Sequence, residues 1–391
     1  MTRKTESLWS RSFIHAWIST FLMGLSFYML IPILPFYLSH QFHAGKTMIG
    51  VILSAYIIAA LIIRPFSGYM VDSFSRKLVY ILSYALFVGA YLGYIFAASI
   101  VFMLILRFFH GLTWGVVATS GNTLAIDIMP AKRRGEGLGY FGLSNNLAMA
   151  IGPTVGQLLS DSNNLNWVFY SALITGVIGL FFASTIKVPV KPPINKEPVS
   201  LDRFILVKGI PVGLNLLLIA VSYGMILSFA AMYGKEMGVQ NPGIFFALMS
   251  FGIAASRIFA GKLVDKGQIH LVAILGILTL IISITFFALM SFASVYFITS
   301  FFIGFGYGII FPSFQTLFIS LAPHTKRGTA NATYLTSFDV GIGIGMLVSG
   351  RVAEAYNLSV AFMIGAAFMI IALLVYAKFT KGFYDINRLQ V

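Results

Sequence analysis

Two ionisable residues lie deep inside otherwise apolar stretches, and both are candidates for carrying charge or protons. Asp339 lies about ten residues inside the apolar segment 330–352, and a helix rises about 1.5 Å per residue, which places it ~15 Å from the segment's start. Arg107 lies inside the apolar segment 100–126. A charge at the centre of a bilayer costs about 2.5–3.5 kcal/mol on insertion scales, so each side chain should face a cavity or a partner.

Asp339 is the residue that the sequence offers for proton transfer. It is the one acidic side chain expected deep in the membrane, and its position is occupied by the neutral Asn146 in the first half of the chain. Burial favours the neutral form of a carboxyl group, which becomes charged when its surroundings become polar. Such a group binds a proton in one state and releases it in another. The alternative is a structural salt bridge with a buried cation.

Composition and apolar patterning indicate a polytopic membrane protein. Of the 391 residues 58% are hydrophobic and 10% are charged, whereas soluble domains carry about 25% charged residues. A membrane helix needs about 20 apolar residues. The apolar segments predict twelve helices: 13–38, 47–70, 78–98, 100–126, 137–160, 165–186, 210–233, 242–263, 270–290, 295–320, 330–352 and 358–379.

The distribution of basic residues predicts the orientation of these helices. The net charge is +14, and most of the 26 Lys and Arg residues fall on one side of the predicted topology. Lys46, Lys235 and Arg351 fall on the other side. Positively charged loops stay in the cytoplasm, so both termini should be cytoplasmic. This asymmetry explains the net charge without a nucleic acid partner, and the chain has no cysteine for disulfides or thiolate sites.

The two halves of the chain repeat one unit. Gly111 and Gly304 are 193 residues apart, and the same offset relates Gly152 to Gly345. The run Arg257–Asp265 repeats the Arg, Phe, Gly, Val and Asp of the run that starts at Arg64 in the same order. The repeat predicts an N-terminal six-helix bundle (1–187), a cytoplasmic linker (188–208) and a C-terminal six-helix bundle (209–391).

A charged signature follows the second apolar segment: Gly68-x-x-x-Asp72-x-x-x-Arg76-Lys77. It resembles the loop between the second and third helices of the major facilitator superfamily, which usually has Gly where Ser75 stands. The resemblance implies an all-α fold of twelve transmembrane helices in two pseudo-symmetric six-helix bundles.

The resemblance also implies a latch that holds the cytoplasmic side closed. Asp127, at the cytoplasmic end of the fourth segment, would pair there with the basic residues of the loop. The alternative is a solvated loop that only marks the topology.

The fourth segment contains Arg107-Phe108-Phe109-His110-Gly111, which resembles the family's Arg-x-x-Gln-Gly sequence linked to proton transfer. His110 replaces the usual Gln and shares a helix face with Arg107. The resemblance therefore implies that Arg107 and His110 take part in proton coupling together with Asp339. The alternative is an arginine bonded to backbone carbonyl groups.

The fifth segment contains small residues that are similar to the antiporter motif of proton-coupled exporters in the same superfamily. The matching positions are Gly139, Gly152, Pro153 and Gly156. Ala148 and Gln157 replace glycines of the motif. Small residues allow close helix contact, so generic helix packing is the alternative.

In the family, the first, fourth, seventh and tenth helices line a central cavity. Besides Arg107, the polar and aromatic candidates for substrate binding there are Tyr28, Trp114, Asn122, Asn215, Tyr223, Tyr307 and Gln315. Such a wall suits an amphipathic organic molecule, and Arg107 would attract an anionic group. Each single aromatic residue has helix packing as its alternative role.

These features predict a secondary transporter of the inner or plasma membrane that exports a small amphipathic molecule in exchange for protons. The substrate would be a drug-like compound or a carboxylate-bearing metabolite or metallophore. The chain has no Walker, His-Glu-x-x-His or Gly-x-Ser-x-Gly motif, so we expect no enzymatic activity, cofactor or metal, and protons as the coupling ion. The expected partners are the substrate and the lipid bilayer, with the chain as a monomer.

Two alternatives remain at this stage. One is a proton-coupled importer of a sugar or an organic acid. The other is a lipid-handling membrane protein, which would need a lateral apolar opening.

The topology gives a first prediction. Reporter proteins fused at Lys196 in the linker and after Val391 should both report a cytoplasmic location, because the basic residues gather on that side. Alkaline phosphatase and green fluorescent protein fusions measure this from opposite directions. A periplasmic or extracellular signal from either site would overturn the count of twelve helices.

Overall fold

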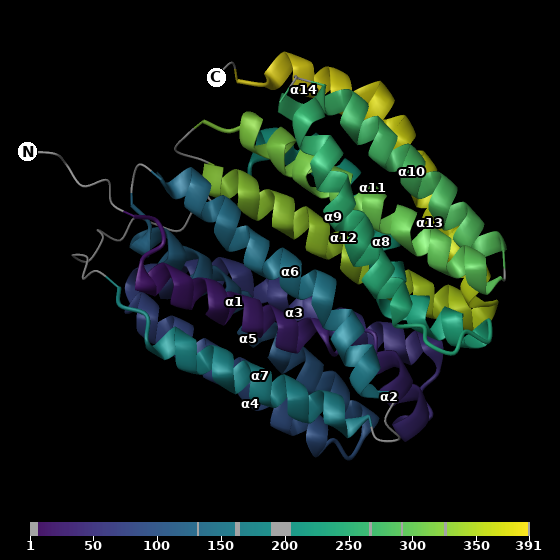
Figure 1. The fold of residues 1–391 in the computed structure, drawn as a ribbon, viewed down its shortest axis with the longest axis horizontal. Helices are drawn as coiled ribbons and strands as arrows, with labels where there is room; N and C mark the ends of the chain where they lie inside the picture. Colours follow the sequence, from purple (N-terminus) through teal and green to yellow (C-terminus); the bar gives the residue numbers. More distant parts are fainter. Residues whose placement is uncertain are drawn as a thin grey trace, which may run out of the picture. The chain divides into compact units, whose positions relative to one another are not determined.

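The computed structural model describes residues 7–130, 133–160, 165–188, 205–265, 268–290, 292–323 and 327–389, and these are helical with short connections and no β-strand (Figure 1). Contacts divide the chain into two compact units: residues 1–33 with 58–198, and residues 34–57 with 199–391. The repeat-based division differs at residues 34–57, which it assigns to the first half. Residues 189–204, most of the predicted linker, lie outside the described residues.

Unit 1 contains six helices that correspond to the first half of the repeat. They are α1 (Arg11–Tyr28), the later part of α3 (Lys46–Ser73), α4 (Arg76–Ile95), α5 (Ile100–Ile128), α6 (Arg134–Ser160) and α7 (Asn166–Ser184). Helix α4 packs on α5 and α7, and α1 packs on α6 and α7. Serine side chains fix two of the helix starts: Ser10 Oγ accepts from the backbone N–H of Phe13, and Ser99 Oγ from that of Phe102, each at 3.2 Å.

Unit 2 contains the second half of the repeat and the early part of α3. Its other elements are α2 (Leu34–Phe42), a 3₁₀ turn η3 (Val207–Gly209), α8 (Ile210–Glu236), α9 (Ile244–Asp265), α10 (Ile269–Leu289), α11 (Ala293–Ser320), α12 (Arg327–Ala355), α13 (Leu358–Val375), a π-helical turn η5 (Tyr376–Thr380) and α14 (Lys381–Asn387). Helix α8 packs on α12, α9 on α11, and α10 on α11 and α13.

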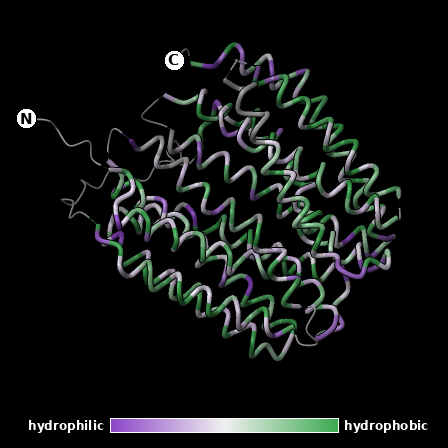
Figure 2. Tube along the Cα trace, in the orientation of Figure 1, coloured by the Kyte–Doolittle hydropathy of each residue, from purple (hydrophilic) through white to green (hydrophobic). Residues whose placement is uncertain are grey.

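Within the described ranges, nine helices are long and apolar enough to cross a membrane. They are α3, α4, α5, α7, α8, α10, α11, α12 and α13, and Figure 2 shows how hydrophobic residues dominate the long helices. The other three predicted segments correspond to α1 with α2, to the glycine-rich α6 and to α9, whose apolar part is Ile244–Ser256. The order of the helices is therefore that of a twelve-helix membrane protein.

The first predicted helix is the one whose path differs from the expectation. The sequence predicts one bent helix over 13–38, whereas α1 ends at Tyr28 and α2 begins at Leu34. Pro32 has no N–H to continue the ladder of helical bonds. The connecting turn is instead held by two tighter bonds, Leu30 N–H to Phe27 O at 3.0 Å and Ile33 N–H to Leu30 O at 3.1 Å.

The repeat is present in the helix contacts of each unit. A Cβ atom on Gly115 would lie 2.9 Å from the carbonyl oxygen of Ala60, and a Cβ on Gly308 would lie 2.9 Å from that of Ile253. All four positions obey the 193-residue offset. Gly152 and Gly345 likewise lie against α1 and α8 at equivalent places. Glycine thus allows matching backbone approaches in both units.

The α9–α11 contact gives a second prediction. A Cβ on Gly304 would overlap the carbonyl oxygen of Met249, whereas a Cβ on Gly89 of α4 meets no atom within 4 Å. Gly304→Ala should lower the melting temperature of the purified protein, because overpacking costs about 1–3 kcal/mol. Gly89→Ala, the matched control, should leave it equal or higher, since alanine favours a helix by about 0.5–1 kcal/mol. Equal melting temperatures for the two variants would contradict the close backbone contact.

Candidate functional site

The charged signature is built at the junction of α3 and α4. Arg76 begins α4, and its Nη1 lies 2.5 Å from Oδ2 of Asp127 near the end of α5. Solvent reaches only 17% of the Arg76 side chain and 4% of the Asp127 side chain. The ion pair therefore ties the start of α4 to the end of α5. Gly68 and Lys77 are half-buried, and the side chain of Asp72 lies outside the described part of the structure. The latch itself stays a prediction.

Arg107 and His110 lie together in a buried polar cluster on α5. Arg107 is 2% exposed and His110 is fully buried. The Tyr94 hydroxyl of α4 lies 3.0 Å from Nδ1 of His110, and the Arg107 side chain also hydrogen-bonds to Tyr94. The sequence places Arg107 and His110 on one helix face, and the structure adds Tyr94 as the residue that contacts both.

Aromatic rings surround His110 in this cluster. The His110 ring lies 4.3 Å from Phe87, and 5.2 Å from Tyr91, measured between ring centres. Trp114 stacks on Phe27 of α1 at 5.2 Å and lies 5.7 Å from Phe87. Trp114 therefore belongs to the group of rings beside His110, and its contact with a substrate stays a prediction.

Tyrosines of α4 form a buried polar face that the sequence reasoning missed. Tyr80, Tyr84, Tyr91 and Tyr94 are all at most 1% exposed. Tyr80 and Tyr84 bond to Ser19 of α1, and the Tyr91 hydroxyl lies 2.9 Å from Oγ of Ser26. Their spacing puts them on one side of a 3.6-residue helix, a signal that was available in the sequence.

A second aromatic cluster lies in unit 2. Tyr223 of α8 and Tyr307 of α11 are fully buried, with ring centres 4.7 Å apart. Phe311 stacks on Tyr307 at 5.3 Å, and Phe338 of α12 lies 4.8 Å from Phe311. Among the residues that the structure describes, none hydrogen-bonds to the buried Tyr307 hydroxyl. Asp339 follows Phe338 directly and is half-buried.

The other predicted substrate-binding residues lie in different surroundings. Asn215 is fully buried, and its Nδ2 donates to the carbonyl oxygen of Ala372 at 2.9 Å, which ties α8 to α13. The exposed Gln315 donates to Oδ1 of Asn331 at 2.9 Å. Tyr28 is half-buried at the end of α1, and Asn122 is exposed on α5. Substrate contact by these residues stays a prediction.

The predicted antiporter motif forms the contact between α6 and α1. A Cβ on Gly152 would lie 2.5 Å from Cβ of Tyr28, and a Cβ on Gly156 would overlap the backbone of Met29. Pro153 lies inside α6, and Gly139 belongs to the same helix. Gly152 and Gly156 are small because two backbones meet where α1 ends. The structure shows the packing, and a role in exchange stays a prediction.

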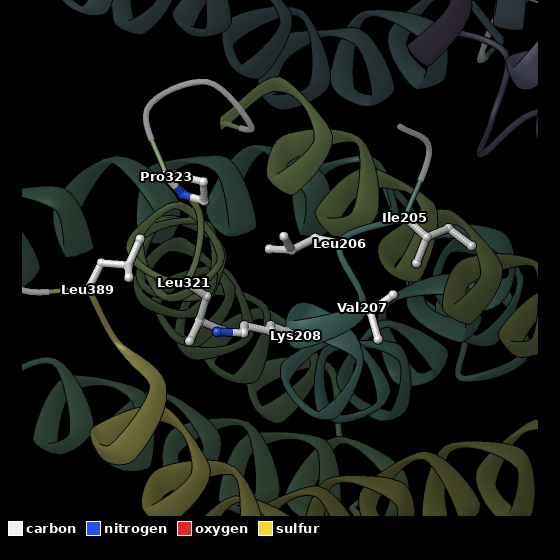
Figure 3. A pocket seen from close by; sticks show the side chains of 7 residues that line it. All are labelled: Ile205, Leu206, Val207, Lys208, Leu321, Pro323 and Leu389. Atoms are coloured by element: carbon white, nitrogen blue, oxygen red, sulfur yellow. The ribbon is translucent and has the colours of Figure 1, made fainter. Parts of the chain in front are cut away.

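A pocket of about 360 Å³ lies elsewhere in unit 2, near the start of α8 and the end of α11 (Figure 3). Its lining residues are Ile205, Leu206, Val207, Lys208, Leu321, Pro323 and Leu389. None of them belongs to the predicted site.

Comparison with known proteins decides the family. The sequence profile described as Major Facilitator Superfamily matches residues 16–324 and 212–383. The chain belongs to the major facilitator superfamily. It is therefore a multi-pass membrane transporter of small molecules and not an enzyme.

Curated relatives of this transporter include exporters at low identity. The staphylopine export protein of Staphylococcus aureus (strain Mu50 / ATCC 700699) is 21% identical over 336 residues, covering 80% of this chain and 83% of that protein. Multidrug resistance protein MdtG of Escherichia coli O9:H4 (strain HS) is 28% identical over 331 residues, covering 80% of each. A variant of the nucleoside transporter NupG shares the fold, with a TM-score of 0.79, 16% identity and coverage of 94% of this chain and 100% of that one.

The Arg76–Asp127 pair gives a third prediction. Removing one partner of a buried ion pair costs about 3–5 kcal/mol, so Arg76→Asp and Asp127→Arg should each lower transport and the melting temperature. The double variant restores opposite charges and should recover much of both. Transport assays and thermal unfolding measure the two effects. Losses that simply add in the double variant would show that the two side chains do not act as a pair.

Proposed function

We propose that this transporter exports small amphipathic organic molecules that carry an anionic group, and that it exchanges them for protons. The observation that carries the proposal is a half-buried carboxylate, Asp339, next to the aromatic cluster of unit 2. Placing a carboxyl group within a membrane helix costs free energy, so its presence there indicates a functional role. The names of the curated relatives, a staphylopine export protein and a multidrug resistance protein, support export as the direction.

The substrate class follows from the chemistry of the two clusters. Arg107 is a buried cation in unit 1, one helical turn from His110, whose ring lies against Phe87. A guanidinium binds carboxylate or phosphate in two parallel hydrogen bonds. In unit 2, the buried hydroxyl of Tyr307 offers a polar group among rings. A drug-like compound or a carboxylate-bearing metabolite or metallophore meets these requirements.

Asp339 is proposed to carry the coupling proton, with Arg107 and His110 as the accompanying residues of the first half. The transport cycle would move Asp339 between a drier and a wetter environment. Its carboxyl group would be neutral in the first and charged in the second. Each proton that enters the cell supplies about 2.3 kcal/mol per 100 mV of membrane potential, which is enough to drive export against a gradient.

The orientation belongs to the same proposal. The transporter would lie in the inner or plasma membrane with both termini in the cytoplasm, because its basic residues gather on that side. No cofactor takes part, and the proton is the coupling ion.

Asp339→Asn is the fourth prediction. It fixes the neutral form, so it should abolish transport driven by a pH gradient and leave binding, or exchange down a substrate gradient, within about tenfold, since one neutral hydrogen bond is worth about 0.5–1.5 kcal/mol. The assay uses inside-out vesicles with carboxyfluorescein as the anionic probe, within a panel of drugs and metabolites.

Asp385→Asn is the matched control, because Asp385 lies on the short helix α14 and its side chain is 42% exposed. It should leave pH-driven transport unchanged. Export like wild type by Asp339→Asn would refute the assignment and direct attention to His110 and Asp127. Substrate movement in the opposite direction would favour the importer.

A further inference from the structure

Tyr94 is a buried residue that no sequence motif pointed to, and it contacts both polar residues of the α5 cluster. Its hydroxyl lies 3.0 Å from Nδ1 of His110, and the Arg107 side chain hydrogen-bonds to it. Its ring stacks on Phe169 of α7, with 5.4 Å between centres and 16° between planes. Ring and hydroxyl thus make separate contacts, one apolar and one polar.

The repeat separates the role of the ring from that of the hydroxyl. At the 193-residue offset, Phe287 stands for Tyr94 and Phe362 for Phe169. Phe287 and Phe362 also pack together in unit 2, with ring centres 4.8 Å apart. The ring contact therefore belongs to the shared architecture. The hydroxyl does not, because the second unit packs without it.

The partners of the hydroxyl are also confined to the first unit. Ser300 stands at the position equivalent to Arg107, and Ile303 at the position equivalent to His110. The polar set of Tyr94, Arg107 and His110 is thus present as a whole in one half and absent as a whole from the other. Because the second unit has the same fold without these three side chains, they are candidates for a functional rather than a structural role.

Either atom of the Tyr94–His110 contact can donate, and the donors and acceptors around it favour one direction. A guanidinium has only donors, so Arg107 donates to the Tyr94 oxygen. The hydroxyl then has its own hydrogen to donate, and Nδ1 of His110 lies within reach as the acceptor. This arrangement selects the tautomer of His110 that carries its proton on Nε2.

We propose that Tyr94 is a positioning residue that holds the Arg107 guanidinium and one tautomer of His110 in place to receive an anionic group of the substrate. The proposal rests on the proposed function for its substrate class. Arg107 has several rotatable bonds, so fixing its side chain when a substrate binds costs conformational entropy. A fixed acceptor reduces this cost because it restricts the side chain before the substrate arrives. The Tyr94 hydroxyl keeps its own proton throughout.

The test compares Tyr94→Phe with Tyr84→Phe in the full-length protein. Tyr84 is an equally buried tyrosine of the same helix whose hydroxyl donates to the carbonyl oxygen of Ser19 at 3.1 Å, away from His110. Phenylalanine at position 94 reproduces the natural arrangement of Phe287, so the variant should fold. Thermal unfolding checks this for both variants.

The first readout is the tautomer of His110, from ¹⁵N NMR of protein labelled at histidine, with His110→Gln to assign the signal. Wild type and Tyr84→Phe should show one tautomer with an unprotonated Nδ1, and Tyr94→Phe should show a mixture. The same tautomer in all three proteins would overturn the proposal, and so would a protonated Nδ1 in wild type.

The second readout is transport of carboxyfluorescein. Tyr94→Phe should raise KM about tenfold, the effect of one hydrogen bond to a charged group, and leave kcat within about twofold. A loss confined to kcat, or an equal rise in Tyr84→Phe, would overturn the positioning role. If wild type does not transport the probe at all, the substrate class of the proposed function fails, while the NMR readout still decides the role of Tyr94.

Discussion

The structure depends on one constraint, the cost of placing a charge in a medium that cannot solvate it. Arg107 is enclosed by unit 1 with 2% of its surface exposed, and its side chain hydrogen-bonds to Tyr94. A cation without such partners would destabilise this position within the membrane. The hydroxyl of Tyr94 and the imidazole of His110 have no counterparts at the equivalent positions of the second unit, which hold Phe287 and Ile303, and together they make the charge tolerable. We interpret that concentration of polar groups as the place where the two repeats diverged in function.

The remaining architecture is what the two repeats kept in common. Small residues recur where helix backbones meet, as Gly115 against Ala60 and Gly308 against Ile253. In a bilayer the hydrophobic effect contributes little to the association of helices, so close packing has to stabilise their contacts. Rings in equivalent places also persist, as the pair Tyr94–Phe169 matches the pair Phe287–Phe362. The two units therefore share their helix packing but differ in their buried polar groups, so similar scaffolds offer different chemistry.

Much of this could be predicted from the sequence. Apolar length gives the helices, because the bilayer fixes how long a span must be. Charge and spacing indicated that Asp127 would lie near the basic loop, and Arg76 is the residue that it contacts. The break after Tyr28 was harder to foresee, since a proline bends some helices and interrupts others. The cluster of Phe311 and Phe338 was missed because single phenylalanines in an apolar helix carry no periodic signal. The tyrosine face of α4 did carry one, and only its burial shows that the hydroxyls point inward.

The central claim is that an outgoing substrate and an incoming proton share one cycle. The most direct measurement is the decay of a pH gradient in inside-out vesicles loaded with acid and containing the purified transporter. Addition of carboxyfluorescein or another anionic amphipathic compound should release protons from the vesicles, at a rate that saturates with substrate concentration and is absent from vesicles without the protein. A pH gradient that no compound of the panel disturbs, while the same compounds are still transported, would contradict proton exchange.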